Sequence, residues 1–467
     1  MEGFRTDVRV VNLSYLTTDW YADQMRHPVY NAAGIPMFAN PRYWAYDSLA
    51  YSFVVNRNPN PVDVRLALDS LYNYDGSRFG AKILTSPRMF IPVDLDAAMR
   101  HYATGIPETD SLIAASVTDI PVSFAGASGI NLSKTLSLDM IANNVLSGFS
   151  RPTYFASTVP TSYYLGLDNY LSPTGVAYEV TPVPTSGEYN ITAQKGFRNI
   201  VGSYRWGGLD QPGAEGLYLD ETVRRMVSSF RSAMLNIAEN LLRAPSAAPD
   251  AETVRFYAER GGTAPATQAD MARIILNMIE EKLPGSVTPY DSLHALYMAQ
   301  DYLRLYAVTG NADDLRRASE LADGEVDRYG SLVKYATTLS ARDVAALGRS
   351  EGYALNYLPI ALGVKNITDI LSSGEQSADI SLLEELMPQL DITDLYTVGP
   401  YLYIYGADNE LLASEADRYA DEEYIFRLGM AINKASAEIG RTAPSYGDSV
   451  MARFNFTPAQ WASVLRR

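Results

Sequence analysis

The feature that most constrains the fold of this chain is a change in its hydrophobic pattern. The first half carries short β-branched and aromatic runs separated by Pro, Gly and Ser, whereas the second half carries long segments in which apolar residues recur every three or four positions. The first pattern predicts short strands mixed with helices, and the second predicts amphipathic helices. We therefore expect an α/β (α+β) N-terminal domain followed by an all-α domain.

The pattern changes at residues 207–213, a stretch rich in Gly and Pro. Such a stretch between periodic segments is typical of a domain boundary. At 467 residues the chain is also longer than one hydrophobic core usually supports. We therefore predict an α/β domain over residues 1–215 and a helical domain over residues 216–467, the latter ending in a tail that docks through Phe454, Phe456 and Trp461.

The first domain opens with a predicted central strand from Val8 to Leu16, which is β-branched and almost continuously apolar. The side chains of residues 17–19 then offer caps for a helix that begins near Trp20. Alternation and β-propensity predict three further strands, of which the first is very short or at an edge because of Pro92. These strands span Met89–Val93, Thr153–Ser157 and Val176–Val180, and a helix through Leu138, Ile141, Val145 and Leu146 precedes the second of them.

The second domain is expected to consist of helices. Asp220 precedes one whose apolar positions run from Val223 to Leu241, and Gly310-Asn311 links two others into a helix pair of the tetratricopeptide-like kind. The match to that repeat is partial, because Leu315 stands where a small residue is expected. The other predicted helices span Met271–Ile279, Leu293–Val308, Leu315–Tyr329 and Glu423–Ile439.

Composition argues against several classes of function. The formal charge of -16 disfavours nucleic acid and anionic membrane surfaces as partners. The sequence has no cysteine, which removes disulfides and thiolate chemistry, and it has no run of 18 apolar residues that would predict membrane insertion. The start lacks a secretory signal, so the chain is expected to be either cytoplasmic or part of something longer.

No catalytic motif is complete, and we expect no catalytic residue, metal or cofactor. Nucleotide-binding glycine motifs are lacking, and the three histidines His27, His101 and His294 have no metal-ligand spacing. The segment Gly126–Gly129 resembles a nucleophile elbow but has Ile130 where the second glycine belongs, which predicts a loop. Two carboxylate pairs could serve a glycosidase, although caps and solvated surface explain them more simply. These pairs are Asp19 with Asp23 and Asp94 with Asp96.

A cluster that mixes amide, carboxylate and aromatic groups follows the first predicted strand, at the kind of position where α/β sheets bind ligands. Such a mixture suits a sugar-binding surface, as does the excess of Tyr over Phe, 33 to 14. The simpler alternative is a capped helix with Trp20 anchored in the core. The candidate ligand-binding residues are Asn12, Asp19, Trp20, Tyr21 and Gln24, together with Trp206 in the later segment YRWGGLD.

Several segments resemble a known family. They read EGFRTDVRVVNLSYLTTDWYADQMRHPVYNAAGIPM (Glu2–Met37), SRPTYFAST (Ser150–Thr158), YYLGLDNYL (Tyr163–Leu171) and YRWGGLD with YLDETVRRM (Tyr204–Met226). The resemblance is to the soluble portion of a bacterial membrane-protein family, domain-of-unknown-function family 2723, which is similar to protein O-mannosyltransferases of GT-C architecture. It covers the first half well and thins out through the helical half.

The resemblance implies a periplasmic or extracytoplasmic region tethered to the inner membrane by a polytopic part that holds the glycosyl-transfer chemistry. This region would bind or position the acceptor polypeptide or glycan while the membrane part uses a lipid-linked sugar. Two alternatives remain at this point. One is a self-contained carbohydrate-active enzyme with its site at Asp19 and Trp20, and the other is a structural brace for the membrane part.

Overall fold

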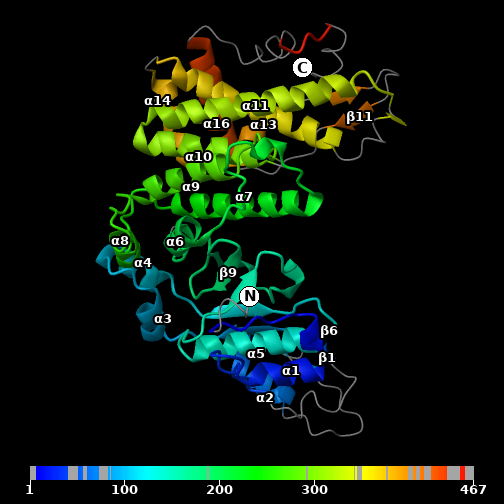
Figure 1. Cartoon of the computed structure of the whole chain (residues 1–467), viewed down its shortest axis with the longest axis vertical. Coiled ribbons are helices and arrows are strands. Elements are labelled where there is room, and N and C mark those ends of the chain that lie inside the picture. Colours follow the sequence, from blue (N-terminus) through cyan, green and yellow to red (C-terminus); the bar gives the residue numbers. More distant parts are fainter. Residues whose placement is uncertain are drawn as a thin grey trace. The chain divides into compact units, whose positions relative to one another are not determined.

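The computed structural model describes most of the chain, and the statements below concern the described residues. These are residues 7–39, 51–55, 60–72, 83–84, 86–186, 189–290, 293–340, 342–343, 350–374, 377–397, 403–405, 411–414, 422–438 and 453–457. The chain divides into two units, Met1–Asn199 with Pro249–Ala264 and Ile200–Ala248 with Pro265–Arg467. An α/β region is followed by a helix-rich region, as predicted (Figure 1). The boundary predicted after residue 215 stays a prediction and falls inside the second unit.

The described part of the first unit contains three small sheets, each of three strands. In strand order, the first sheet is β3 (Ile83–Leu84), β1 (Tyr51–Val54) and β6 (Gly129–Asn131); the second is β2 (Val62–Asp63), β4 (Arg88–Ile91) and β5 (Ile120–Ser123); and the third is β7 (Tyr154–Ala156), β9 (Ala177–Val180) and β8 (Leu171–Pro173). In the second sheet, the middle strand β4 pairs in parallel with β2 and antiparallel with β5. The strands predicted near residues 89, 153 and 176 are therefore confirmed. Pro92 follows a short strand, which lies at the centre of its sheet rather than at an edge.

Helices surround these sheets, and polar side chains start several of them. Asp94 accepts a hydrogen bond from the Ala97 backbone N–H at 2.8 Å, and Asn131 accepts one from that of Lys134 at 3.0 Å. The helical elements of this unit are η1 (Tyr15–Thr17), α1 (Asp19–Arg26), α2 (Val64–Tyr72), α3 (Leu95–Tyr102), α4 (Pro107–Ser116), α5 (Leu132–Leu146), η3 (Thr161–Tyr163), η4 (Asp168–Tyr170), α6 (Ala193–Ser203, whose last residues belong to the second unit) and α8 (Ala251–Ala258).

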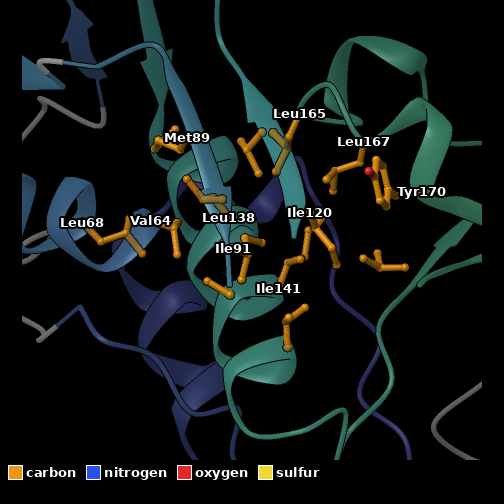
Figure 2. Close-up of a cluster of buried hydrophobic side chains, with 14 of the residues drawn as sticks. Val64, Leu68, Met89, Ile91, Ile120, Leu138, Ile141, Leu165, Leu167 and Tyr170 are labelled. Atoms are coloured by element: carbon orange, nitrogen blue, oxygen red, sulfur yellow. The ribbon is translucent and has the colours of Figure 1, made fainter. Parts of the chain in front are cut away.

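The main core of the first unit lies between helix α5 and the strands of the second sheet (Figure 2). Alternate residues of β4 and β5 point into it, because successive side chains of a strand face opposite sides. Helix α5 contributes residues three positions apart, Leu138 and Ile141, as its periodicity predicts. The helix predicted over these residues is confirmed.

The strand predicted from Val8 to Leu16 is wrong. Residues 8–12 form no regular element, and the chain then turns into η1. The Asn12 side chain explains the turn, because its Oδ1 accepts hydrogen bonds from the backbone N–H groups of Ser14 and Tyr15 at 3.0 and 3.1 Å. The apolar side chains of this segment and of α1 instead form a small second core with α2 and α5. Its buried members are Leu16, Tyr21, Ala22, Met25, Ala39, Leu71, Leu132 and Leu136.

The second unit consists mainly of helices, as predicted. Asp220 caps the first long helix through the Val223 backbone N–H at 2.8 Å, and Gly310 ends another in the left-handed conformation. The helical elements are η5 (Ala214–Gly216), α7 (Glu221–Leu241), α9 (Gln268–Lys282), α10 (His294–Thr309), α11 (Ala312–Ala336), α13 (Ser350–Ser372), α14 (Ala378–Leu386), η6 (Met387–Gln389), α15 (Ile392–Thr397) and α16 (Glu422–Glu438). One antiparallel strand pair, β10 (Tyr403–Tyr405) with β11 (Leu411–Ser414), interrupts this helical region.

The predicted helix pair is present, since α10 and α11 are joined by Gly310-Asn311 and pack against each other. The tetratricopeptide-like label stays a prediction. Part of the tail docks as expected, because Phe454 and Phe456 are buried and the Phe454 ring lies against Gly330 of α11. Trp461 lies outside the described residues. Within the described ranges, no helix has the length and apolar character needed to cross a membrane.

Candidate functional site

The predicted cluster around α1 contains two exposed aromatic rings. Tyr15 is 55% exposed and Trp20 is 57% exposed, and their ring centroids lie 6.1 Å apart at an interplanar angle of 46°. Tyr21 lies beneath both rings as their edge-on neighbour and is buried. The expectation that Trp20 is anchored in the core is therefore wrong, because Tyr21 takes that position. We call Tyr15 and Trp20 the aromatic face.

Hydrogen bonds fix the segment that carries this face. The Tyr21 hydroxyl accepts a bond from the Asn12 backbone N–H at 2.9 Å and donates one to the Val10 carbonyl at 3.2 Å. Arg9 donates to the backbone carbonyl of Gln24 at 3.2 Å. The aromatic face is thus held by the backbone of residues 10–12, without a strand.

The structure brings five of the six predicted ligand-binding residues into this segment. Asn12 and Tyr21 hold it together. Trp20 belongs to the aromatic face, and Asp19 and Gln24 of the same helix are exposed. The Asp19 carboxylate accepts a hydrogen bond from the Trp20 backbone N–H at 2.7 Å. The sixth residue, Trp206, belongs to the second unit, where its half-buried ring lies 5.9 Å from that of Tyr204.

This arrangement suits binding rather than bond cleavage. Exposed aromatic faces pack on the apolar faces of sugar rings or on apolar side chains, and neighbouring carboxylates and amides accept or donate hydrogen bonds. The second candidate carboxylate pair is explained structurally, since Asp94 caps α3. Residues 126–128 form the predicted loop and Gly129 begins β6. Gly126 and Ala127 line, with Arg88, a small pocket of about 280 Å³. Across the described residues, no group of three His or acidic side chains is placed to hold a metal ion.

A second polar cluster, which the sequence did not reveal, lies between the sheet β7-β9-β8 and helix α6. Its centre is Glu179 of β9, whose fully buried carboxylate accepts a hydrogen bond from Lys195 Nζ at 2.7 Å and one from the Tyr102 hydroxyl at 3.3 Å. His101 Nε2 lies 3.9 Å from the same carboxylate. Lys195 Nζ also donates to the Tyr154 hydroxyl at 2.7 Å. We call Glu179, Lys195 and Tyr154 the Glu179 cluster.

The strand register places this cluster on one face of the sheet. Tyr154 of β7 and Ser172 of β8 are the cross-strand partners of Glu179, so the three side chains share a face. Ser172 bonds further to Asn190 at 3.0 Å and to Thr192 at 2.8 Å, both buried beside α6. The opposite face of the same strands contributes to the main core, so this sheet has one apolar face and one polar face.

The charges in the Glu179 cluster stabilise one another. Burial alone would raise the pKa of the Glu179 carboxyl, but the neighbouring His101 and Lys195 outweigh it and hold that pKa below its ordinary value. Burial would lower the pKa of the Lys195 ammonium, yet the negative charge of Glu179 raises it instead. Burial and the charge of Glu179 raise the pKa of the Tyr154 phenol. At neutral pH the cluster therefore holds a carboxylate, an ammonium and a neutral phenol.

The comparisons with known proteins bear on the first unit. The family model described as TMEM260-associated domain 2 matches residues 1–197. No curated protein and no solved structure matches the chain. The match covers nearly all of Met1–Asn199, the longer of the two segments that form the first unit, and it includes the aromatic face and the Glu179 cluster. It connects this region with a domain that is associated with a membrane protein. The resemblance to family 2723 stays a prediction, because the matching model is a different one.

Proposed function

We propose that this chain is the extracytoplasmic region of a membrane glycosyltransferase of the O-mannosyltransferase-like kind, and that it binds the acceptor. The membrane-embedded part of the same protein would perform the transfer from a lipid-linked sugar, and this region would position the acceptor polypeptide or glycan. The sequence resemblance to family 2723 and the match to a TMEM260-associated domain support this proposal. It places the region on the periplasmic or extracytoplasmic face, tethered to the inner membrane.

The observation that carries the proposal is the aromatic face. Two large rings more than half exposed on neighbouring turns are unusual for a surface that only meets water, because their burial is favourable. The neighbouring Asp19 and Gln24 side chains supply hydrogen-bonding groups at the rim. Rings flanked by such groups match a mannosyl residue, which has an apolar ring face and polar hydroxyls at its edge.

A titration tests this function. The full chain is mixed with a synthetic peptide rich in Ser and Thr, prepared with and without α-mannosyl groups, and binding is followed by calorimetry. We expect Trp20→Ala to weaken binding by about tenfold, which is about 1.4 kcal/mol, because the substitution removes one stacking ring.

The matched control is Tyr218→Ala, which removes an aromatic ring that is 91% exposed in the second unit. This control should leave the affinity unchanged. Binding of neither peptide at millimolar concentration, or equal loss in the two variants, would contradict the proposal.

A further inference from the structure

We propose that Arg9 and Arg151 of the first unit form a binding site for a phosphate group, carried by a lipid headgroup or free in solution. The two guanidinium groups meet where the last turn of α1 lies beside residues 33–35. The site does not depend on the function proposed above, because neither arginine belongs to the aromatic face.

The backbone brings the two arginines together. The Ile35 backbone N–H donates to the Met25 carbonyl at 2.8 Å, so the end of α1 and the segment around Ile35 are adjacent. Arg9 Nη2 donates at 3.2 Å to the carbonyl of the residue before Met25. Arg151 donates through Nη1 and Nη2 to the carbonyls of residues 34 and 33, both at 2.9 Å. Two guanidinium groups therefore gather around one short stretch of backbone.

The hydrogen bonds of these guanidinium groups go to backbone carbonyls and to the Met25 sulfur, and to no carboxylate of the described residues. Burial lowers the pKa of the Arg151 guanidinium and the positive charge of Arg9 lowers it further, whereas a neighbouring carboxylate would raise it. By contrast, Arg198 and Arg273 each contact two carboxylates. Arg9 and Arg151 are thus a local pair of uncompensated positive charges in a chain of formal charge -16.

Arg9 also has hydrogen-bond donors that it does not use. Its Nε and Nη1 atoms are buried, and among the described residues they find no acceptor. A buried guanidinium N–H without an acceptor costs free energy, which pairing with an anion would offset. The contacts that Arg9 does make are long, 3.2 Å to a carbonyl and 3.7 Å to the Met25 sulfur, so its side chain can turn toward a ligand at small cost.

This donor set favours phosphate over other anions. Guanidinium groups carry a fixed charge and several N–H groups in one plane, which match the oxygens of a phosphate. A phosphate monoester carries about -1.5 to -2 charge at neutral pH, so it balances two arginines, whereas a carboxylate balances only one. The position of Arg151 is fixed, because its backbone N–H donates to Asn144 Oδ1 at 3.1 Å.

A purely structural role for the two arginines would be to hold residues 33–34 and the end of α1, since carbonyl groups without water need donors. Arg151 and the Nη2 group of Arg9 fulfil that role. It leaves Nε and Nη1 of Arg9 unused. Arg9→Gln separates the two roles, because the amide can still donate to a carbonyl but carries no charge.

The experiment titrates the ¹⁵N-labelled full chain with sodium phosphate at constant ionic strength, with sodium chloride as the reference salt. We expect a saturable shift of the Arg9 Nε–H signal with a dissociation constant on the order of 1 mM. Vesicles of phosphatidylcholine with and without phosphatidic acid supply the lipid arm. Sedimentation with the phosphatidic acid vesicles alone indicates a lipid source, and phosphate binding without sedimentation indicates a free phosphate.

Arg9→Gln should weaken binding about tenfold without changing the unfolding temperature, and Arg9→Lys, which keeps the charge, should lie between. The control Arg100→Gln removes an exposed positive charge of the same unit and should leave binding unchanged, as should Trp20→Ala. The proposal is overturned if neither phosphate nor phosphatidic acid binds, if chloride causes the same shift, or if Arg9→Gln and Arg100→Gln bind equally well. Mannosyl-peptide binding has no bearing on these outcomes.

Discussion

Both units of this protein bury a charged side chain completely, but the two charges have different surroundings. Glu179 of the first unit connects through Lys195 and Tyr154 to the surface. Arg231 of the second unit lies in α7, and its donors go to backbone carbonyls of residues 283–289. A buried charge that ends at the surface can serve recognition, whereas one surrounded by main chain serves architecture.

Two buried carboxylates extend the comparison. In the first unit, the partners of Glu179 outweigh burial and lower its pKa. In the second unit, burial outweighs the partner of Asp301 and raises its pKa to about 7, because Arg304 Nη1 lies 3.4 Å away. The first unit therefore stabilises the charged form of its buried carboxyl by more than burial destabilises it. In the second unit, burial has the larger effect on the Asp301 carboxyl.

The largest effect is expected from Arg231→Met. The substitution leaves buried carbonyls of residues 283–289 without donors and removes a guanidinium that lies 4.5 Å from the centre of the Tyr290 ring. We expect a loss of about 3–5 kcal/mol in the free energy of unfolding. Urea unfolding measures it, together with hydrogen exchange over residues 283–290.

The control is Arg224→Met, which alters an exposed arginine of the same helix and should cost less than about 0.5 kcal/mol. If Arg231→Met were as stable as this control, the hydrogen bonds from Arg231 to residues 283–289 would not stabilise the second unit as described.

A smaller loss is expected from Glu179→Gln, which leaves the half-buried Lys195 without its charged partner. At pH 7 the loss should be about 2 kcal/mol. Because the folded pKa of Glu179 is lowered, its contribution is present above the ordinary value of 4.5 and disappears as pH falls through the folded pKa. The free energy of unfolding should therefore change more between pH 7 and pH 3 in the unaltered chain than in the Glu179→Gln variant. An equal pH dependence in the two proteins would mean that His101 and Lys195 do not stabilise the Glu179 carboxylate as described.

The smallest effect is a gain in stability from Asp301→Asn. The unfolded chain releases the Asp301 proton near pH 3.8, whereas the folded chain keeps it up to about pH 7, so the folded state loses stability over this interval as pH rises. The amide has no such penalty, and we expect the variant to gain about 1.4 kcal/mol at pH 8 relative to its difference at pH 6, because about one unit of the shift falls in this interval. Thermal unfolding at the two pH values measures this. If the variant gained no stability relative to the unaltered chain between pH 6 and pH 8, Arg304 would stabilise the Asp301 carboxylate enough to offset its burial.

The sequence predicted helices better than it predicted the start of the chain. Periodicity over ten or more residues, as from Val223 to Leu241, specifies a helix because its apolar stripe needs a core. The run from Val8 to Leu16 looked like a strand by composition, but strand formation requires a partner strand, which composition does not encode. The Asn12 turn decided the outcome locally.

The candidate site was predictable in part. The residues around Trp20 could be grouped because they are neighbours in sequence, although which ring is buried depended on the packing of Tyr21 against α2 and α5. Glu179 could not be found, because a lone acid alternating with Tyr178 and Val180 has the pattern of a solvent-facing strand position. Helix α6, which starts 14 residues later, and Tyr102 of α3 cover that position.

The most direct test of the central claim is the indole N–H signal of Trp20 during titration with a mannosylated peptide. The chain has four tryptophans, so a Trp20→Phe variant assigns the signal without ambiguity. The account predicts that the Trp20 signal shifts in a saturable manner with the mannosylated peptide, and also with the unmodified acceptor peptide where that peptide binds. An unmoved Trp20 signal at concentrations where the peptide binds would contradict the claim that the aromatic face is the recognition surface.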